Sequence, residues 1–123
     1  WKSVNSLQLF SETKNNLLRA VVPPANCEKV MKDLKNKFKF FIDWSGSLFW
    51  IEVASKDDDK IKEIKKMILQ NNGYLTIIKK SEEFDFSEKI FTIDDTKLMI
   101  SKKIKESFDP KGIFNPGKMY KDF

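Results

Sequence analysis

Arg19 has the most specific chemistry of any residue in this sequence. It is the one arginine among 23 basic side chains, and it lies in a short apolar run at residues 17–22. A guanidinium carries a planar fork of N–H donors that can grip a carboxylate or a phosphate with two parallel hydrogen bonds. Arg19 is therefore a candidate anion-binding residue. The alternative is a structural ion pair with Glu52 or Asp43 across a sheet.

Other reactive side chains are scarce. The 123 residues contain no histidine and a single cysteine, Cys27. This composition excludes histidine-based catalysis, histidine-ligated metals, thiolate clusters and a disulfide framework. No metal site is predicted, and no catalytic residue can be named. We expect a reducing, cytoplasmic setting, because no apolar run approaches the roughly 18 residues of a membrane span and no signal-peptide pattern opens the chain.

The charge favours a solvated surface over a nucleic-acid footprint. The chain has 18 acidic residues and a formal net charge of +5, but all basic residues except one are lysines. Nucleic-acid readers rely on arginine, so no nucleic-acid partner is predicted. The length suits one domain and is too short for a doubly wound nucleotide-binding domain. Because the chain begins with Trp1, we expect it to be a piece of a longer protein.

Apolar periodicity predicts four strands and two helices before residue 80. The strands are expected at residues 17–22, 38–44, 48–54 and 74–79. The first helix follows an Asn26 N-cap, and the second opens on acidic residues 57–59 and ends at Gly73, a candidate C-cap. The buried helix stripes are expected at Cys27, Val30, Met31 and Leu34, and at Ile61, Ile64, Met67 and Ile68.

This βαββαβ order predicts an α+β, ferredoxin-like fold with a four-stranded antiparallel sheet. We expect a lead-in segment at residues 1–16, a core at 17–80, and a C-terminal helix and extended tail at 81–123. The last helix is expected to start at Thr92, with Asp95 as its capping-box acid, and to end before Pro110. Its apolar stripe is Ile100, Ile104 and Phe108.

One face of such a sheet is left open by the helices. Strand alternation places aromatic, polar and charged side chains on this face, namely Arg19, Asp43, Trp50, Glu52, Tyr74 and Thr76. The second strand can be read in two ways; if Phe38, Phe40, Ile42 and Trp44 face the helices, Asp43 joins the open face. A face with two large aromatics is poorly suited to bare water, so either a partner covers it, or the lead-in segment or the last helix does.

The tail at residues 109–120 contains half of the prolines and glycines of the chain. Pro110, Gly112, Pro116 and Gly117 all lie within eight positions, which predicts a stiff, non-helical path that docks against something fixed. This segment resembles the C-terminal signature of FAD-linked oxidases of the vanillyl-alcohol-oxidase type. The matching residues are Asp109-Pro110, Gly112 and Asn115-Pro116-Gly117-Lys118.

Further blocks resemble the FAD-binding subunits of bacterial glycolate oxidases within that family. They are Leu18-Arg19, Val22-Pro23-Pro24, Asp43-Trp44-Ser45-Gly46 with Trp50, and Asn72-Gly73-Tyr74-Leu75-Thr76. The sequence departs from the expected pattern at Leu18, Ser47 and Asn72. The resemblance implies a cap domain that covers the flavin ring of an FAD-dependent 2-hydroxy-acid (glycolate) oxidoreductase, while a separate N-terminal domain binds most of the FAD.

The same resemblance assigns candidate roles and partners. Arg19, Trp50 and Tyr74 are candidate substrate-binding residues. Candidates to face the flavin or contact the FAD domain are Asp43, Glu52, Thr76, Asn115, Pro116, Gly117 and Lys118. The implied partners are the FAD-binding domain of the same protein, other glycolate oxidase subunits and a small 2-hydroxy acid. The isolated piece is expected to be inactive, and the complex to be cytoplasmic or peripheral to the inner membrane.

Two other functions remain open at this stage. RNA-recognition domains share the βαββαβ order, and residues 46–50 faintly echo their aromatic third strand. Against this, the first strand lacks an aromatic stacking residue, and the tail has no role in RNA binding. The third reading is a protein-interaction domain without a cofactor.

Overall fold

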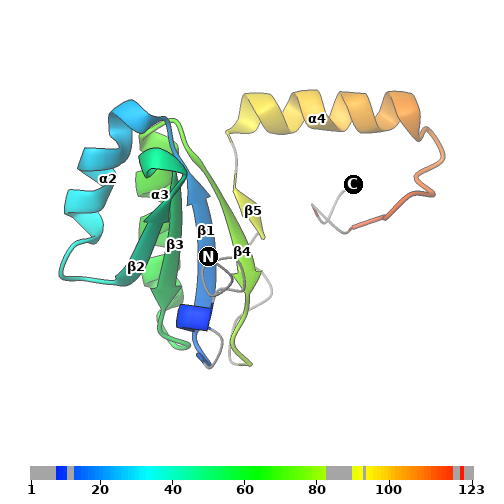
Figure 1. Ribbon diagram of the computed structural model, residues 1–123. Helices are drawn as coiled ribbons and strands as arrows, with labels where there is room; N and C mark the ends of the chain where they lie inside the picture. Colours follow the sequence, from blue (N-terminus) through cyan, green and yellow to red (C-terminus); the bar gives the residue numbers. More distant parts are fainter. Residues whose placement is uncertain (1–7, 11–12, 83–89, 93, 118–119, 121–123) are drawn as a thin grey trace.

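A computed structural model of the chain describes residues 8–10, 13–82, 90–92, 94–117 and 120. Its centre is a five-stranded antiparallel sheet of order β2-β3-β1-β4-β5, with helices α2 and α3 packed on one face (Figure 1). The strands are β1 (Asn16–Val21), β2 (Lys39–Asp43), β3 (Leu48–Val53), β4 (Tyr74–Lys79) and β5 (Phe91–Thr92). The α-helices are α2 (Cys27–Leu34), α3 (Asp58–Gln70) and α4 (Asp95–Phe108).

The predicted α+β class and the order of its first elements are confirmed. Strands β1 to β4 and helices α2 and α3 follow one another as βαββαβ, and β1 lies between β3 and β4 as a ferredoxin-like arrangement requires. The strand count was wrong by one. Two residues, Phe91 and Thr92, add β5 to the free edge of β4.

The core lies between the sheet and the two helices. Strand alternation sends Leu18, Phe49 and Leu75 to the helix side, where they are fully or almost fully buried. Both predicted helix stripes pack here: Val30, Leu34, Ile61, Ile64 and Ile68 are buried, and Cys27, Met31 and Met67 are partly buried against them. The structure resolves the ambiguity in the second strand, because Phe38, Phe40 and Ile42 also pack on this core.

Several local predictions were wrong. Trp44 does not continue β2 inward; it begins a short 3-10 helix, η3 (Trp44–Gly46), and is 57% exposed. Lys65 of α3, which is not part of the predicted apolar stripe, is nevertheless buried. Asn16, assigned to the lead-in segment, is the first residue of β1.

The end of α3 also differs from the prediction. Asn72, not Gly73, has the left-handed conformation that closes the helix, with a φ of 56°. Gly73 is required for another reason. A Cβ at this position would lie 2.6 Å from the carbonyl oxygen of Val21 and 2.8 Å from the Cγ2 of Ile68. Glycine therefore permits close contact between the end of α3 and β1.

The last helix begins later than predicted, because Thr92 belongs to β5. Asp94 is the N-cap of α4, and its side chain accepts a 2.9 Å hydrogen bond from the N–H of Lys97. The helix ends at Phe108, before Pro110, as expected. No helix in the described part of the chain is both long and apolar enough to cross a membrane.

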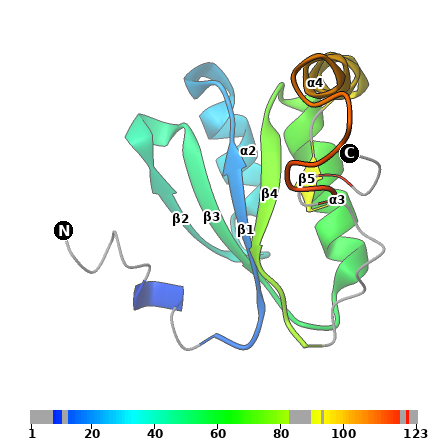
Figure 2. The same cartoon turned by 90° about the vertical axis from the view of Figure 1, so that its right-hand side faces the viewer.

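Helix α4 does not return to the core. It extends away from the sheet on the side opposite α2 and α3 (Figure 1), and none of its residues is buried. Figure 2 shows the sheet broadside with α2 and α3 behind it, and α4 viewed along its axis beyond β4. The open face is thus flanked by α4 at its β5 edge.

Candidate functional site on the open face and the C-terminal arm

A row of side chains crosses the open face over all five strands. Arg19 in β1 is directly opposite Trp50 in β3 and Thr76 in β4. Trp50 is in turn opposite Phe41 in β2, and Thr76 is opposite Phe91 in β5. Directly opposed residues have Cβ atoms about 5 Å apart, so these five form a continuous cross-strand row. All five are half-buried.

Arg19 occupies the centre of this cross-strand row, and no ion pair joins it to an acidic side chain of the described residues. Its guanidinium carbon lies 5.1 Å from the ring centroid of Trp44. The predicted alternative, an ion pair with Glu52 or Asp43, was wrong. Among the described residues, Glu52 pairs with Lys39, and Asp43 accepts a 2.8 Å hydrogen bond from the N–H of Trp44. The guanidinium of Arg19 is therefore a candidate to bind an anion.

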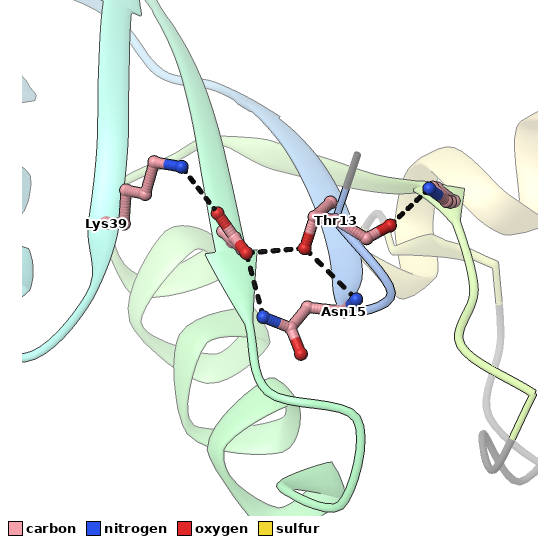
Figure 3. Close-up of polar contacts among 5 residues, drawn as sticks. Thr13, Asn15 and Lys39 are labelled. Atoms are coloured by element: carbon pink, nitrogen blue, oxygen red, sulfur yellow. Dashed lines mark hydrogen bonds and ion pairs between the residues drawn. The ribbon is translucent and has the colours of Figure 1, made fainter. Parts of the chain in front are cut away.

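Glu52 fastens the lead-in segment to one end of the open face. Its Oε1 accepts hydrogen bonds from Thr13 Oγ1 at 2.5 Å and Asn15 Nδ2 at 2.8 Å, and Lys39 Nζ lies 3.1 Å from Oε2 (Figure 3). Burial alone would raise the pKa of Glu52, but the bonds from Thr13 and Asn15 and the charge of Lys39 outweigh it and lower that pKa. Glu52 is thus an ionised anchor for the lead-in segment.

The lead-in segment covers part of the open face, as one of the two earlier alternatives expected. A short 3-10 helix, η1 (Gln8–Phe10), lies beside the sheet (Figures 1 and 2). The side chain of Phe10 is buried, and the Nζ atom of Lys39 lies 5.1 Å from the centroid of the Phe10 ring. Lys79 Nζ also donates to the carbonyl oxygen of Thr13. At the other end of the face, Tyr74 is 41% exposed.

The C-terminal arm, defined here as α4 and residues 109–117, presents apolar side chains to solvent. The predicted stripe exists but is uncovered: Ile100, Ile104 and Phe108 are 48%, 54% and 85% exposed. Met99, Ile113 and Phe114 extend this apolar surface. Large exposed apolar side chains gathered on one arm are typical of an interaction site, so the arm is a candidate docking element.

Asp109 organises the tail of the arm. Its carboxylate is buried and accepts hydrogen bonds from the N–H groups of Ile113 at 2.9 Å and Phe114 at 2.8 Å. Lys105 Nζ donates to the same carboxylate and to the carbonyl oxygen of Phe114. The bond from Lys105, together with the two backbone bonds, lowers the pKa of Asp109 to about 2. The path of the tail is therefore fixed, as its proline and glycine content predicted.

The end of the arm exposes the predicted family signature. Asn115 and Gly117 have positive φ values of 48° and 68°, and both residues and Pro116 are exposed. Lys118 lies outside the described residues. Further on, the Tyr120 ring lies 6.1 Å from the ring of Phe91, and burial raises the pKa of Tyr120. The chain end thus returns to the outermost residue of the cross-strand row.

A cavity of about 350 Å³ lies between α2 and α3, on the helix side of the molecule. Apolar residues such as Phe38 and Met67 line it together with Lys37 and Glu63, which form an exposed ion pair. Its lining carries both acidic and basic side chains, and Lys37 is already paired with Glu63. The cavity is therefore a weaker candidate for an anion site than the surroundings of Arg19. No group of histidine, cysteine and acidic side chains within the described ranges could hold a metal ion.

Comparisons with known proteins agree with the signature in the arm. The family model for FAD linked oxidases, C-terminal domain, matches residues 87–119. The chain is also 27% identical over 122 residues to the glycolate oxidase subunit GlcE of Escherichia coli (strain K12). The resemblance to the C-terminal domain of FAD-linked oxidases is confirmed. This alignment covers 98% of the chain but 31% of the relative, so the chain spans about a third of that protein's length. No solved structure matches.

The sequence prediction missed three residues of the open face. Phe41 was detectable, because sending Phe40 and Ile42 inward leaves it on the open side. Phe91 could not be detected from the sequence, since a strand of two residues has no periodicity. Trp44 was assigned to the wrong side because strand alternation was extended past the end of β2.

Proposed function

We propose that this chain is the C-terminal cap domain of a subunit of an FAD-dependent 2-hydroxy-acid oxidoreductase, with glycolate as the substrate of the parent enzyme. The observation that carries this proposal is the C-terminal arm. The segment matched by the FAD-linked oxidase family is also the one whose apolar side chains have no cover within the described residues. The similarity to a glycolate oxidase subunit supports the substrate.

The partner of the arm in this proposal is the FAD-binding domain of the same protein. The relative is about three times as long as the chain, which leaves room for such a domain. Asp109 and Lys105 hold the tail in one conformation, so docking does not have to order a flexible segment. Phe108, Ile113 and Phe114 are the most exposed apolar side chains and would be its main anchors.

The open face fits the flat ring of a flavin. Its cross-strand row combines aromatic side chains with hydrogen-bonding groups on Arg19 and Thr76, and it is half-buried before any partner is added. When bound, FAD supplies the redox chemistry by accepting a hydride from the hydroxyl-bearing carbon and passing the electrons to further carriers. In this proposal Arg19 holds the substrate carboxylate, and Trp50 and Tyr74 line the substrate side.

The remaining assignments follow from the same proposal. Most of the FAD is bound by the N-terminal domain, the isolated chain is inactive, and the enzyme works with other glycolate oxidase subunits. We propose that it is cytoplasmic, with at most a peripheral attachment to the inner membrane through the complex. A nucleic-acid role gains no support, because β1 presents Arg19 on the open face where RNA-recognition domains use a stacking aromatic.

Docking of the arm can be tested with the full-length protein carrying Ile104→Ser and Phe114→Ser. We expect this double variant to expose the flavin, so that iodide quenches its fluorescence several-fold more strongly than in the wild type. Lys102→Ser is the matched control, because Lys102 is exposed on the same helix but two residues from the apolar stripe and so on another side. Equal quenching in wild type, control and double variant would refute docking by the arm.

A further inference from the structure

The turn after β2 holds Trp44 in an unfavourable backbone conformation. Trp44 and Ser45 have consecutive positive φ values of 51° and 53°, and Gly46 follows at 93°. A left-handed conformation is disfavoured for any residue with a Cβ and is exceptional for a bulky one. Such conformations persist only where the surroundings enforce them, and they concentrate at binding and catalytic sites.

Contacts on every side enforce this turn. Asp43 Oδ1 accepts the N–H of Trp44 at 2.8 Å, and the carbonyl oxygen of Trp44 accepts the N–H of Ser47 at 3.1 Å. The carbonyl oxygen of Ser47 in turn accepts the N–H of Val22, just after β1. Gly46 packs so closely on the start of α2 that a Cβ there would lie 2.9 Å from the sulfur of Cys27. The turn is therefore fixed against both α2 and β1.

The result of this turn is the stacking of an exposed indole on Arg19. The guanidinium carbon lies 5.1 Å from the Trp44 ring centroid, so the π face of the ring meets the cation. A cation–π contact engages the charge of the guanidinium and needs no hydrogen-bond acceptor for its N–H donor edge. No acidic side chain in the described part of the chain competes for that edge, and the cross-strand neighbours Trp50 and Thr76 are uncharged.

We propose that Trp44 is a positioning residue for anion binding by Arg19. In this proposal, contact with the indole limits the orientations of the guanidinium, and its N–H donors bind the carboxylate of a small 2-hydroxy acid. A flexible arginine would lose side-chain entropy on binding, whereas Arg19 has already lost much of it in the stack. This inference rests on the proposed function, because it takes Arg19 as the carboxylate-binding residue.

The test is calorimetric titration of glycolate into the full-length FAD-loaded protein, which does not depend on turnover. We expect Trp44→Leu to weaken glycolate binding about two- to fivefold, the range of an exposed cation–π contact. Trp44→Phe, which keeps an aromatic face, should bind within twofold of wild type. Arg19→Met should bind at least tenfold more weakly, and adding Trp44→Leu to it should cause no further loss.

The possible failures can be told apart. Wild-type protein that does not bind glycolate, or Arg19→Met that binds it normally, would overturn the proposed function at this site. A normal affinity in Trp44→Leu, combined with weak binding in Arg19→Met, would overturn only the role of Trp44. Equal losses from Trp44→Leu with and without Arg19 would also overturn it, since Trp44 would then act independently of the guanidinium. Melting temperatures of all variants identify any that lose binding by unfolding.

Discussion

Replacement of Glu52 by glutamine is the most direct test of the anchor that fastens the lead-in segment to the sheet. The substitution keeps the shape of the side chain and removes its charge. Glu52 accepts side-chain hydrogen bonds from Thr13 and Asn15 and pairs with Lys39, and its side chain is 12% exposed. The charge is thus screened little by solvent, and its loss should be measurable.

The magnitude follows from the three contacts. A hydrogen bond to a charged acceptor contributes about 1.5–3 kcal/mol, and a neutral one about 0.5–1.5 kcal/mol. Glutamine can still accept both bonds at Oε1, so each becomes weaker by roughly 1 kcal/mol. The ion pair adds less than about 1 kcal/mol, because Lys39 is 61% exposed. We expect Glu52→Gln to lower the free energy of unfolding by about 2 kcal/mol.

Urea denaturation at neutral pH measures this effect, and Glu63→Gln is the matched control. Glu63 lies 3.8 Å from Lys37, with both side chains largely exposed, so its substitution should cost less than about 0.5 kcal/mol. Equal losses for the two variants would refute the reasoning, because the buried network would then add nothing to an ordinary surface ion pair.

The pH dependence gives an independent check on Glu52. Its pKa in the folded protein is below the ordinary value of 4.5, so the ionised form stabilises the fold. That stabilisation is complete above pH 4.5 and disappears as the pH falls through the lowered pKa of the folded state. The difference in stability between wild type and Glu52→Gln should therefore close in acid. A constant difference across this range would contradict the assigned cause.

Two further predictions concern the glycine and the carboxylate that shape neighbouring elements. Gly73→Ala should lower the free energy of unfolding, measured by urea denaturation, by about 2–3 kcal/mol, because the new Cβ meets the backbone of β1. Gly112→Ala has nothing within 4 Å of its Cβ and should lose only the roughly 1–2 kcal/mol that a left-handed φ costs. Equal losses for the two variants would refute the steric argument. Acidification should leave the tail intact at pH 4 and release it as the pH falls through the pKa of Asp109, about 2, because this pKa is lowered from 3.8. NMR shifts of the Ile113 and Phe114 amide protons report the release, and movement of both amides above pH 4 would contradict it.

Much of the fold was predictable because its elements have strong periodicity. Both helix stripes and three inward strand faces were assigned correctly from the alternation of apolar residues. Failures occurred where a few residues compete for two elements. Thr92 is a good N-cap by type, but pairing of Phe91 and Thr92 with β4 takes it into the sheet, and Asp94 caps α4 instead. Local propensity carries no information about this pairing, because β4 is distant in the sequence.

The candidate site was less predictable, since its decisive contacts connect distant segments. The ion-pair alternative for Arg19 failed because Glu52 is engaged by Thr13 and Asn15, in a lead-in segment without clean periodicity. The stacking of Trp44 on Arg19 depends on a left-handed turn, and alternation carries no information about such a turn. Strand alternation identified which residues share the open face, but not which of them form pairs.

The two halves of the proposed function rest on separate parts of the chain. The family match covers residues 87–119 and so the arm, whereas Arg19, Trp44 and Trp50 lie outside it. The arm is therefore the part of this chain that resembles FAD-linked oxidases, and the proposed anion site is argued from the open face alone. The two sets of variants should accordingly separate: arm variants expose the flavin, and Arg19 variants weaken glycolate binding while the flavin stays protected. If Arg19→Met exposed the flavin as strongly as the arm variants, the open face would be part of the docking surface rather than a substrate site.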